Sequence, residues 1–178
     1  MSLDRLRSLA PPPEEPLEPG DPEGWRPVED ELGTALPADF KRFTELYGSG
    51  KFDDFLYLLN PFSADPAGNL VAAKDTMLAD YAETRSKFPD RLPMPPYPEP
   101  GGLLPLGRSD NGNELYWLTE GAPDGWGVVA FAGRSTDHEV HEHPVTRFLE
   151  LLLSGELDTS VFPGSFLRRS KHEFVPST

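Results

Sequence analysis

The sequence predicts a single-domain α+β fold in which an antiparallel sheet that contains a meander packs against several α-helices. The first reason is the order of the segments: two helical patterns, a strand, a helix, a run of short strands between residues 103 and 140, and a last helix. The second is size, because 178 residues suffice for one domain with a core and are too few for two comfortable ones. Hydrophobic residues make up 37% of the chain, which is typical of a folded protein.

Residues 1–24 are predicted to form a short helix and a linker, ahead of a domain that takes residues 25–178. Leucines recur at every third position from Leu3 to Leu9, but so short a helix is marginal unless it docks on the domain. Residues 10–23 are rich in proline and acidic residues, which favours a semi-extended spacer over a proline-rich docking motif.

Residues 25–48 are predicted to form two short helices joined at Leu36 and Pro37. In the first helix Val28 and Leu32 are four apart and share a face. The acidic residues 29–31 are expected at the start of this helix, where negative charge suits the helix dipole.

The second of these helices is predicted to begin with Pro37 at its first position, where the missing N–H costs nothing. Gly48 is expected to end it with a positive φ. Its apolar face is formed by residues at i, i+3 and i+7, namely Phe40, Phe43 and Tyr47. A strand is expected soon afterwards, at residues 55–59.

A longer helix is predicted from Asn69, as its N-cap, to about Phe88. One face of it is expected to carry Leu70, Met77, Leu78, Tyr81 and Phe88. Residues 89–102 contain too many prolines for regular structure. They are predicted to form a long loop that packs across a surface or takes part in binding.

An antiparallel meander is predicted between residues 103 and 140. Asn111 and Gly112 are typical of a two-residue type I′ hairpin between strands at residues 103–106 and 115–118. Further strands are expected at residues 126–131 and 136–140. A last helix is then predicted to begin at Pro144 and to end before Gly155, with an apolar face made of Val145, Phe148, Leu149 and Leu152.

The net charge of −14 disfavours nucleic acid and anionic membranes as direct partners and favours a basic protein partner. The same charge can also serve solubility alone. The absence of cysteine excludes disulfides and thiolate metal sites. No apolar run approaches the roughly 20 residues that span a bilayer, and the N-terminus lacks the apolar core of a secretory signal, so a cytoplasmic location is expected.

No catalytic centre is predicted. The sequence contains no G-x-S-x-G motif, no cysteine nucleophile and neither of the common glycine-rich phosphate loops. With 30 acidic residues, pairs of neighbouring carboxylates arise by accident. No cofactor is therefore expected.

Two polar clusters invite a metal hypothesis. His138, His141 and His143 lie within six residues, but alternate residues of a strand point to opposite faces, so solvated histidines at a strand end are favoured over a metal site. Residues 110–114 carry the oxygen ligands that calcium prefers but lack the spacing of a calcium loop, and a hairpin turn explains them more simply.

Exposed acidic residues at turns are the candidates for partner binding. Asp110 and Glu114 flank the first predicted turn of the meander, and Glu120 and Asp124 flank the second. Trp126 follows the second turn, where an aromatic residue is either half-exposed, as in a protein-binding hot spot, or packed under the hairpin. Trp117, in an alternating strand, is expected in the core.

The order and spacing of these motifs resemble the SUKH superfamily, the immunity and cell-wall-assembly-regulator (Smi/Knr-type) proteins, over about residues 25 to 176. In the first half of the chain the resemblance is carried by Trp25, Glu29, Leu32, Gly33, Leu36, Pro37, Asp39, Phe40, residues 47–50 and residues 58–61. In the second half it is carried by residues 103–107 and 110–114, Trp117, Trp126, Phe148, Leu149, Gly155 and residues 174–176.

The resemblance implies a non-catalytic protein that binds and neutralises a cognate toxin of a bacterial polymorphic-toxin system, often a nuclease. Two alternatives are open. One is a regulatory scaffold of the cell-wall-regulator type that binds endogenous proteins. The other, suggested by the residues alone, is a small metal-dependent hydrolase that uses His138, His141 and His143.

Overall fold

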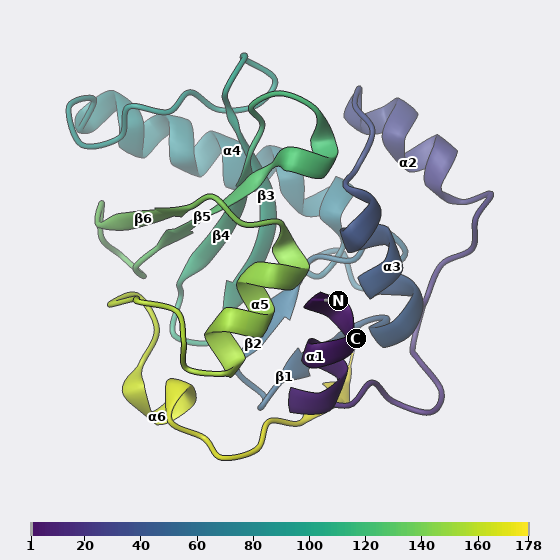
Figure 1. Ribbon diagram of the computed structural model, residues 1–178. Helices are drawn as coiled ribbons and strands as arrows, with labels where there is room; N and C mark the ends of the chain where they lie inside the picture. The colour runs from purple at the N-terminus through teal and green to yellow at the C-terminus, as the bar shows by residue number, and fades with distance from the viewer. Residues whose placement is uncertain (1, 178) are drawn as a thin grey trace.

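A seven-stranded antiparallel sheet is the central layer of the structure, a computed structural model that describes residues 2–177 (Figure 1). The strand order is β6-β5-β4-β3-β2-β1-β7, so the first six strands follow one another as neighbours and the last strand pairs with the first. The strands are β1 (Gly50–Phe52), β2 (Leu56–Leu58), β3 (Leu103–Ser109), β4 (Glu114–Leu118), β5 (Gly127–Phe131), β6 (His138–His141) and β7 (Phe174–Pro176). The predicted α+β class and the meander are confirmed; β1 and β7 were not predicted.

The two faces of the sheet are covered by different helices. The helix α4 (Leu70–Lys87) packs on one face, and α3 (Ala38–Tyr47) and α5 (Val145–Leu153) pack on the other (Figure 1). Two neighbouring residues of β4 show that side chains alternate between the two faces of the sheet. The ring centroid of Tyr116 lies 5.9 Å from that of Tyr81 of α4, whereas the ring centroid of Trp117 lies 4.8 Å from that of Phe40 of α3. The central strands are therefore buried on both sides, and Trp117 is in the core as predicted.

The two helices predicted within residues 25–48 are present as α2 (Trp25–Leu32) and α3. The expected place of the acidic residues was wrong, because α2 already begins at Trp25 and residues 29–31 lie in its second half. The Glu29 carboxylate instead accepts a hydrogen bond from the Leu36 amide, 2.8 Å away, and pairs with Lys41. Pro37 is the N-cap of α3, one position earlier than predicted.

The N-terminal helix α1 (Ser2–Leu9) docks on α5 (Figure 1). Leu6 is fully buried, and Arg5 forms ion pairs with Glu150 and Glu156. The segment that follows also lies on the domain, since the Leu17 carbonyl accepts a 2.6 Å hydrogen bond from the Ser49 amide.

Gly48 allows this close approach of the linker. It has a φ of +66°, as predicted, and a Cβ at this position would lie 2.1 Å from the Leu17 carbonyl oxygen. Any side chain here would therefore displace the linker from the end of α3.

The helix α4 begins as predicted, with the Asn69 side chain accepting hydrogen bonds from the amides of Val71 and Ala72. The prediction for Phe88 was wrong: it follows the last turn of α4 and is 49% exposed. The proline-rich loop packs across the surface, where the Tyr97 hydroxyl donates to the Leu32 carbonyl at 2.7 Å.

The prediction of a type I′ turn at Asn111 and Gly112 was also wrong. The loop of the β3–β4 hairpin has three residues, because Ser109 and Asn113 close it with a 3.0 Å backbone hydrogen bond. Of the loop residues 110–112 only Gly112 has a positive φ, whereas a type I′ turn needs two. The helix α5 lies where it was predicted. Two further short helices are η1 (Pro123–Gly125), between β4 and β5, and α6 (Gly164–Leu167), between α5 and β7.

Candidate partner-binding surface

The four carboxylates proposed for partner binding lie at opposite ends of β4. Asp110 and Glu114 adjoin the β3–β4 hairpin loop, whereas Glu120 and Asp124 lie in the connection from β4 to β5. Asp110, Glu120 and Asp124 are exposed and Glu114 is half-buried. Because the length of a strand separates the two pairs, they form two acidic patches rather than one.

Three of the four carboxylates already have partners within the chain. The Asp110 Oδ1 lies 3.0 Å from the Lys51 Nζ, and the Asp124 Oδ1 accepts a 2.7 Å hydrogen bond from the Ala38 amide at the start of α3. The Glu120 carboxylate makes no hydrogen bond or ion pair within residues 2–177. Glu120 is therefore the acidic side chain of this set most available to a partner.

Glu114 is the most constrained of the set. Its Oε2 accepts a 2.7 Å hydrogen bond from the Tyr116 hydroxyl, and its Oε1 lies 3.6 Å from the Arg108 Nη2. Burial and the adjacent Glu114 carboxylate both raise the pKa of Tyr116, so this hydroxyl remains protonated and continues to donate.

Trp126 is packed under the hairpin, and the half-exposed alternative was wrong. Its side chain is 4% exposed, and its Nε1 donates to the Gly121 carbonyl at 3.3 Å. Its ring centroid lies 6.3 Å from that of Trp117. Trp126 thus fixes the β4–β5 connection on the core, and with it the position of Glu120 and Asp124.

The histidines of β6 point to opposite faces of the sheet. The His138 ring lies 5.0 Å from Phe131 on the α4 side, and the His141 ring lies 5.2 Å from Phe148 on the α5 side. Burial lowers the pKa of His141 despite the nearby Glu139 carboxylate. Within residues 2–177 no group of three or more histidine or acidic side chains is arranged to hold a metal ion. The geometry required by the metal-dependent hydrolase is not formed by these side chains.

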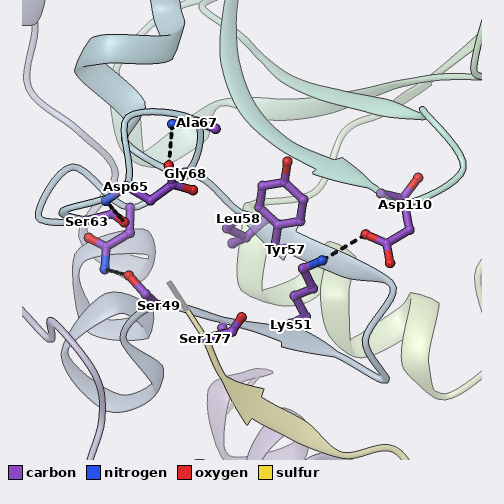
Figure 2. Close-up of a pocket in the computed structure, with 13 residues that line it drawn as sticks. Ser49, Lys51, Tyr57, Leu58, Ser63, Asp65, Ala67, Gly68, Asp110 and Ser177 are labelled. Carbon is purple, nitrogen blue, oxygen red and sulfur yellow. Dashed lines mark hydrogen bonds and ion pairs between the residues drawn. The ribbon is translucent and has the colours of Figure 1, made fainter.

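Figure 2 shows a polar hollow of about 370 Å³ beside Asp110. The Lys51 Nζ points toward the Asp110 carboxylate and lies 5.5 Å from the centre of the Tyr57 ring. On the far wall the Ser49 hydroxyl donates to Glu18 and accepts a hydrogen bond from Asn60. Of the hydroxyl groups in its lining, those of Ser49, Ser63 and Ser109 form hydrogen bonds within the chain.

Lys51 and Tyr57 were not candidates in the sequence. They reach Asp110 only because β1, β2 and β3 pair side by side, with Tyr57 opposite Arg108. No local motif at Lys51 or Tyr57 indicates this pairing.

A family model described as the SMI1 / KNR4 family (SUKH-1) matches residues 19–149. The chain belongs to this family. The match runs from the linker into α5 and therefore includes β1 to β6, and all five residues proposed for partner binding lie inside it. No curated protein and no solved structure matches the chain.

The part of this SUKH-1 chain that follows the match also contributes to the core. Val161, Phe162, Phe166 and Phe174 are all buried.

None of the helices in residues 2–177 is both long and apolar enough to cross a bilayer.

Proposed function

We propose that this SUKH-1 protein acts without catalysis, by binding a cognate bacterial toxin with a basic surface, such as a nuclease, and neutralising it. The observation that carries the proposal is the family match over residues 19–149. The net charge of −14 supports a basic partner, because opposite charges accelerate association and suppress the wrong partners.

The acidic patches at the two ends of β4 are the proposed contact points. Glu120 is free to pair with a basic side chain, whereas Asp110 would have to exchange Lys51 for a cation of the partner. Asp124 would supply negative charge while it still accepts from the Ala38 amide. Trp126, being buried, supports this surface from below and does not form a contact itself.

A regulatory scaffold that binds endogenous proteins is the second candidate, since the family name covers cell-wall regulators as well. The two candidates differ in the kind of partner. A toxin domain harms the cell when it is produced alone, whereas a signalling partner does not.

The decisive experiment is affinity capture from a lysate of the source organism at low and high salt, followed by a test of each captured protein in a bacterial host. Immunity requires a basic partner, bound stoichiometrically, that arrests growth when expressed alone and is harmless when expressed with this chain. Several endogenous signalling proteins, none of them toxic, would establish the scaffold and refute the immunity function. Capture of no partner at either salt would contradict both.

A further inference from the structure

A groove of about 940 Å³ lies beside α4, on the face of the sheet that this helix covers in part. Its floor is formed by the buried side chains of Tyr81, Leu92 and Phe131. Hydroxyl groups of Thr84, Ser135 and Thr136 line its sides. A hollow with an apolar floor and polar walls has the composition of a binding groove, in contrast to the polar hollow beside Asp110.

Exposed apolar side chains adjoin this groove. Large exposed apolar side chains are few in residues 2–177. Phe88, which is 49% exposed, lies at the groove, and Val140, which is 48% exposed, lies on β6 outside the groove's lining. Phe88 lines the groove directly. Val140 of β6 lies opposite Val129 of β5, and Val129 and Phe131 are two residues apart on the same strand. Val140 therefore lies on the same face of the sheet as Phe131.

The strand β6, which follows the groove residues 131–136 in the chain, lies at the edge of the sheet. β6 is the last strand of the sheet and has a neighbour on one side only. An edge strand next to a groove can add the backbone of an extended peptide as a further strand.

The charges at the groove are unusual for so acidic a chain. Arg91 and Arg134 line it, and neither guanidinium forms an ion pair with a carboxylate of residues 2–177. Arg91 makes only a 3.4 Å hydrogen bond to Thr136. Of the two carboxylates in the lining, Glu114 is paired with Arg108 at 3.6 Å, so Asp80 on α4 is the carboxylate whose charge is not offset by an ion pair within residues 2–177.

Arg134 also has a backbone conformation that favours glycine, with a φ of +59°. Its side chain is exposed. Arg134 thus occupies a strained backbone position and its guanidinium has no ion pair within residues 2–177. A role in binding would explain why an arginine lies at this position.

We propose that this groove binds an extended, acidic segment of another protein. An aromatic or large aliphatic side chain of the segment packs on Phe88, Tyr81 and Phe131, and its flanking carboxylates pair with Arg91 and Arg134 in bidentate geometry. The backbone of the segment runs along β6 past Val140. This surface selects negative charge through Arg91 and Arg134, which are not part of the acidic patches proposed for a basic toxin, although Glu114 lines both surfaces. The proposal does not depend on toxin binding.

The test is selection of a displayed library of random nonapeptides on the full-length protein. The expected winners carry an aromatic or large aliphatic residue next to glutamate or aspartate. Synthesised winners should bind the Arg91→Glu/Arg134→Glu variant at least about tenfold more weakly than the wild type. The Arg26→Glu variant, which changes an exposed arginine of α2, is the matched control and should bind normally.

A third variant separates binding from folding. Arg134→Gly relieves the positive φ, so its melting temperature should equal or exceed that of the wild type, yet it should still bind the selected peptides more weakly. Selection of no peptides, selection of basic peptides, or equal binding by the wild type and the double variant would each overturn the proposal. Failure of toxin neutralisation would leave this result unaffected.

Discussion

At the scale of single residues, the structure separates carboxylates that hold the fold from carboxylates that are free to bind. Asp124 caps the start of α3 and Glu114 holds the Tyr116 hydroxyl, whereas Glu120 has no partner in residues 2–177. A change at Asp124 would therefore alter folding and binding together. Glu120 allows binding to be tested alone.

We predict that Glu120→Lys slows association with a basic partner about twofold to fivefold at low salt, because a steering charge is reversed. Stopped-flow or surface plasmon resonance measurements at several salt concentrations would show a smaller salt dependence of the association rate. Asp124→Asn is a suitable comparison, since the amide oxygen can still accept from Ala38 while the charge is removed. Association kinetics identical to the wild type in both variants would rule out this surface.

Asp53 is the buried carboxylate that joins the β1–β2 turn to the C-terminal segment. One oxygen lies 2.5 Å from the His172 Nδ1; the other accepts a 3.0 Å hydrogen bond from the Glu173 amide and lies 3.2 Å from the Arg169 Nη1. His172 is itself buried, and its Nε2 has no hydrogen-bond partner within residues 2–177. The carboxylate is thus the anchor of this cluster.

Removal of this anchor by Asp53→Ala is expected to lower the free energy of unfolding by about 3 kcal/mol. Urea denaturation measures the change. Asp54→Ala is the matched control, because Asp54 has nearly the same φ, +54°, but is exposed. If both variants lose the same stability, the effect comes from backbone strain and not from the buried carboxylate.

At the scale of the elements, β6 is held to α5 and to residues 159–160 by alternate side chains. His141 packs on Phe148, and the Glu139 carboxylate accepts hydrogen bonds from Thr159 and Ser160. Burial alone would raise the pKa of Glu139, but these hydrogen bonds outweigh it and lower the pKa. His141 and Glu139 therefore change their protonation in different ranges of pH.

Stability is predicted to fall as the pH decreases below about 6.5, the ordinary pKa of histidine. The pKa of His141 is lowered in the fold, so between the two pKa values the unfolded chain binds the additional proton and protonation favours unfolding. The contribution of Glu139 is lost only at lower pH, because the hydrogen bonds from Thr159 and Ser160 lower its pKa in the fold.

Chemical denaturation at pH 7.5, 6.5 and 5.5 would separate these contributions. His141→Gln should lose less stability than the wild type between pH 7.5 and 5.5. His138→Gln, a change at a half-buried histidine on the opposite face of β6, should follow the wild type. Parallel curves for all three proteins would contradict the assignment to His141.

At the scale of the whole molecule, the C-terminal segment completes a core that the family match does not include. The Phe174 ring on β7 lies 5.0 Å from both Tyr47 of α3 and Phe52 of β1. The pairing of β7 with β1 also covers what would otherwise be an open edge of the sheet. Residues 156–177 are therefore part of the domain and not a tail.

A chain truncated after Gly155 is predicted to lose cooperative unfolding, because it lacks β7 and four buried apolar side chains. A milder variant, Phe174→Ala, should cost about 3–5 kcal/mol. Thermal unfolding followed by circular dichroism tests both, with Val175→Ala, at a half-buried neighbour, as the control. A truncated chain that unfolds cooperatively would show that the residues up to Gly155 suffice for the fold.

The fold class, the four main helices of the domain and the β3–β6 meander were predictable from the sequence. These depend on local patterns: the spacing of apolar residues in α3 and α5, the Asn69 cap of α4, and the turn residues around Gly112. Each pattern acts within a few residues, so its effect can be read without knowing the rest of the fold.

Which side chains meet depends on contacts between segments that are far apart in the chain. Strands as short as β1 and β7 have no periodicity to detect and form because they pair across more than 120 residues. The burial of Trp126, the separation of the four carboxylates and the groove between α4 and the β5–β6 connection likewise follow from long-range packing. The chemistry of a surface depends on which residues the fold brings together, and spacing along the chain does not contain that information.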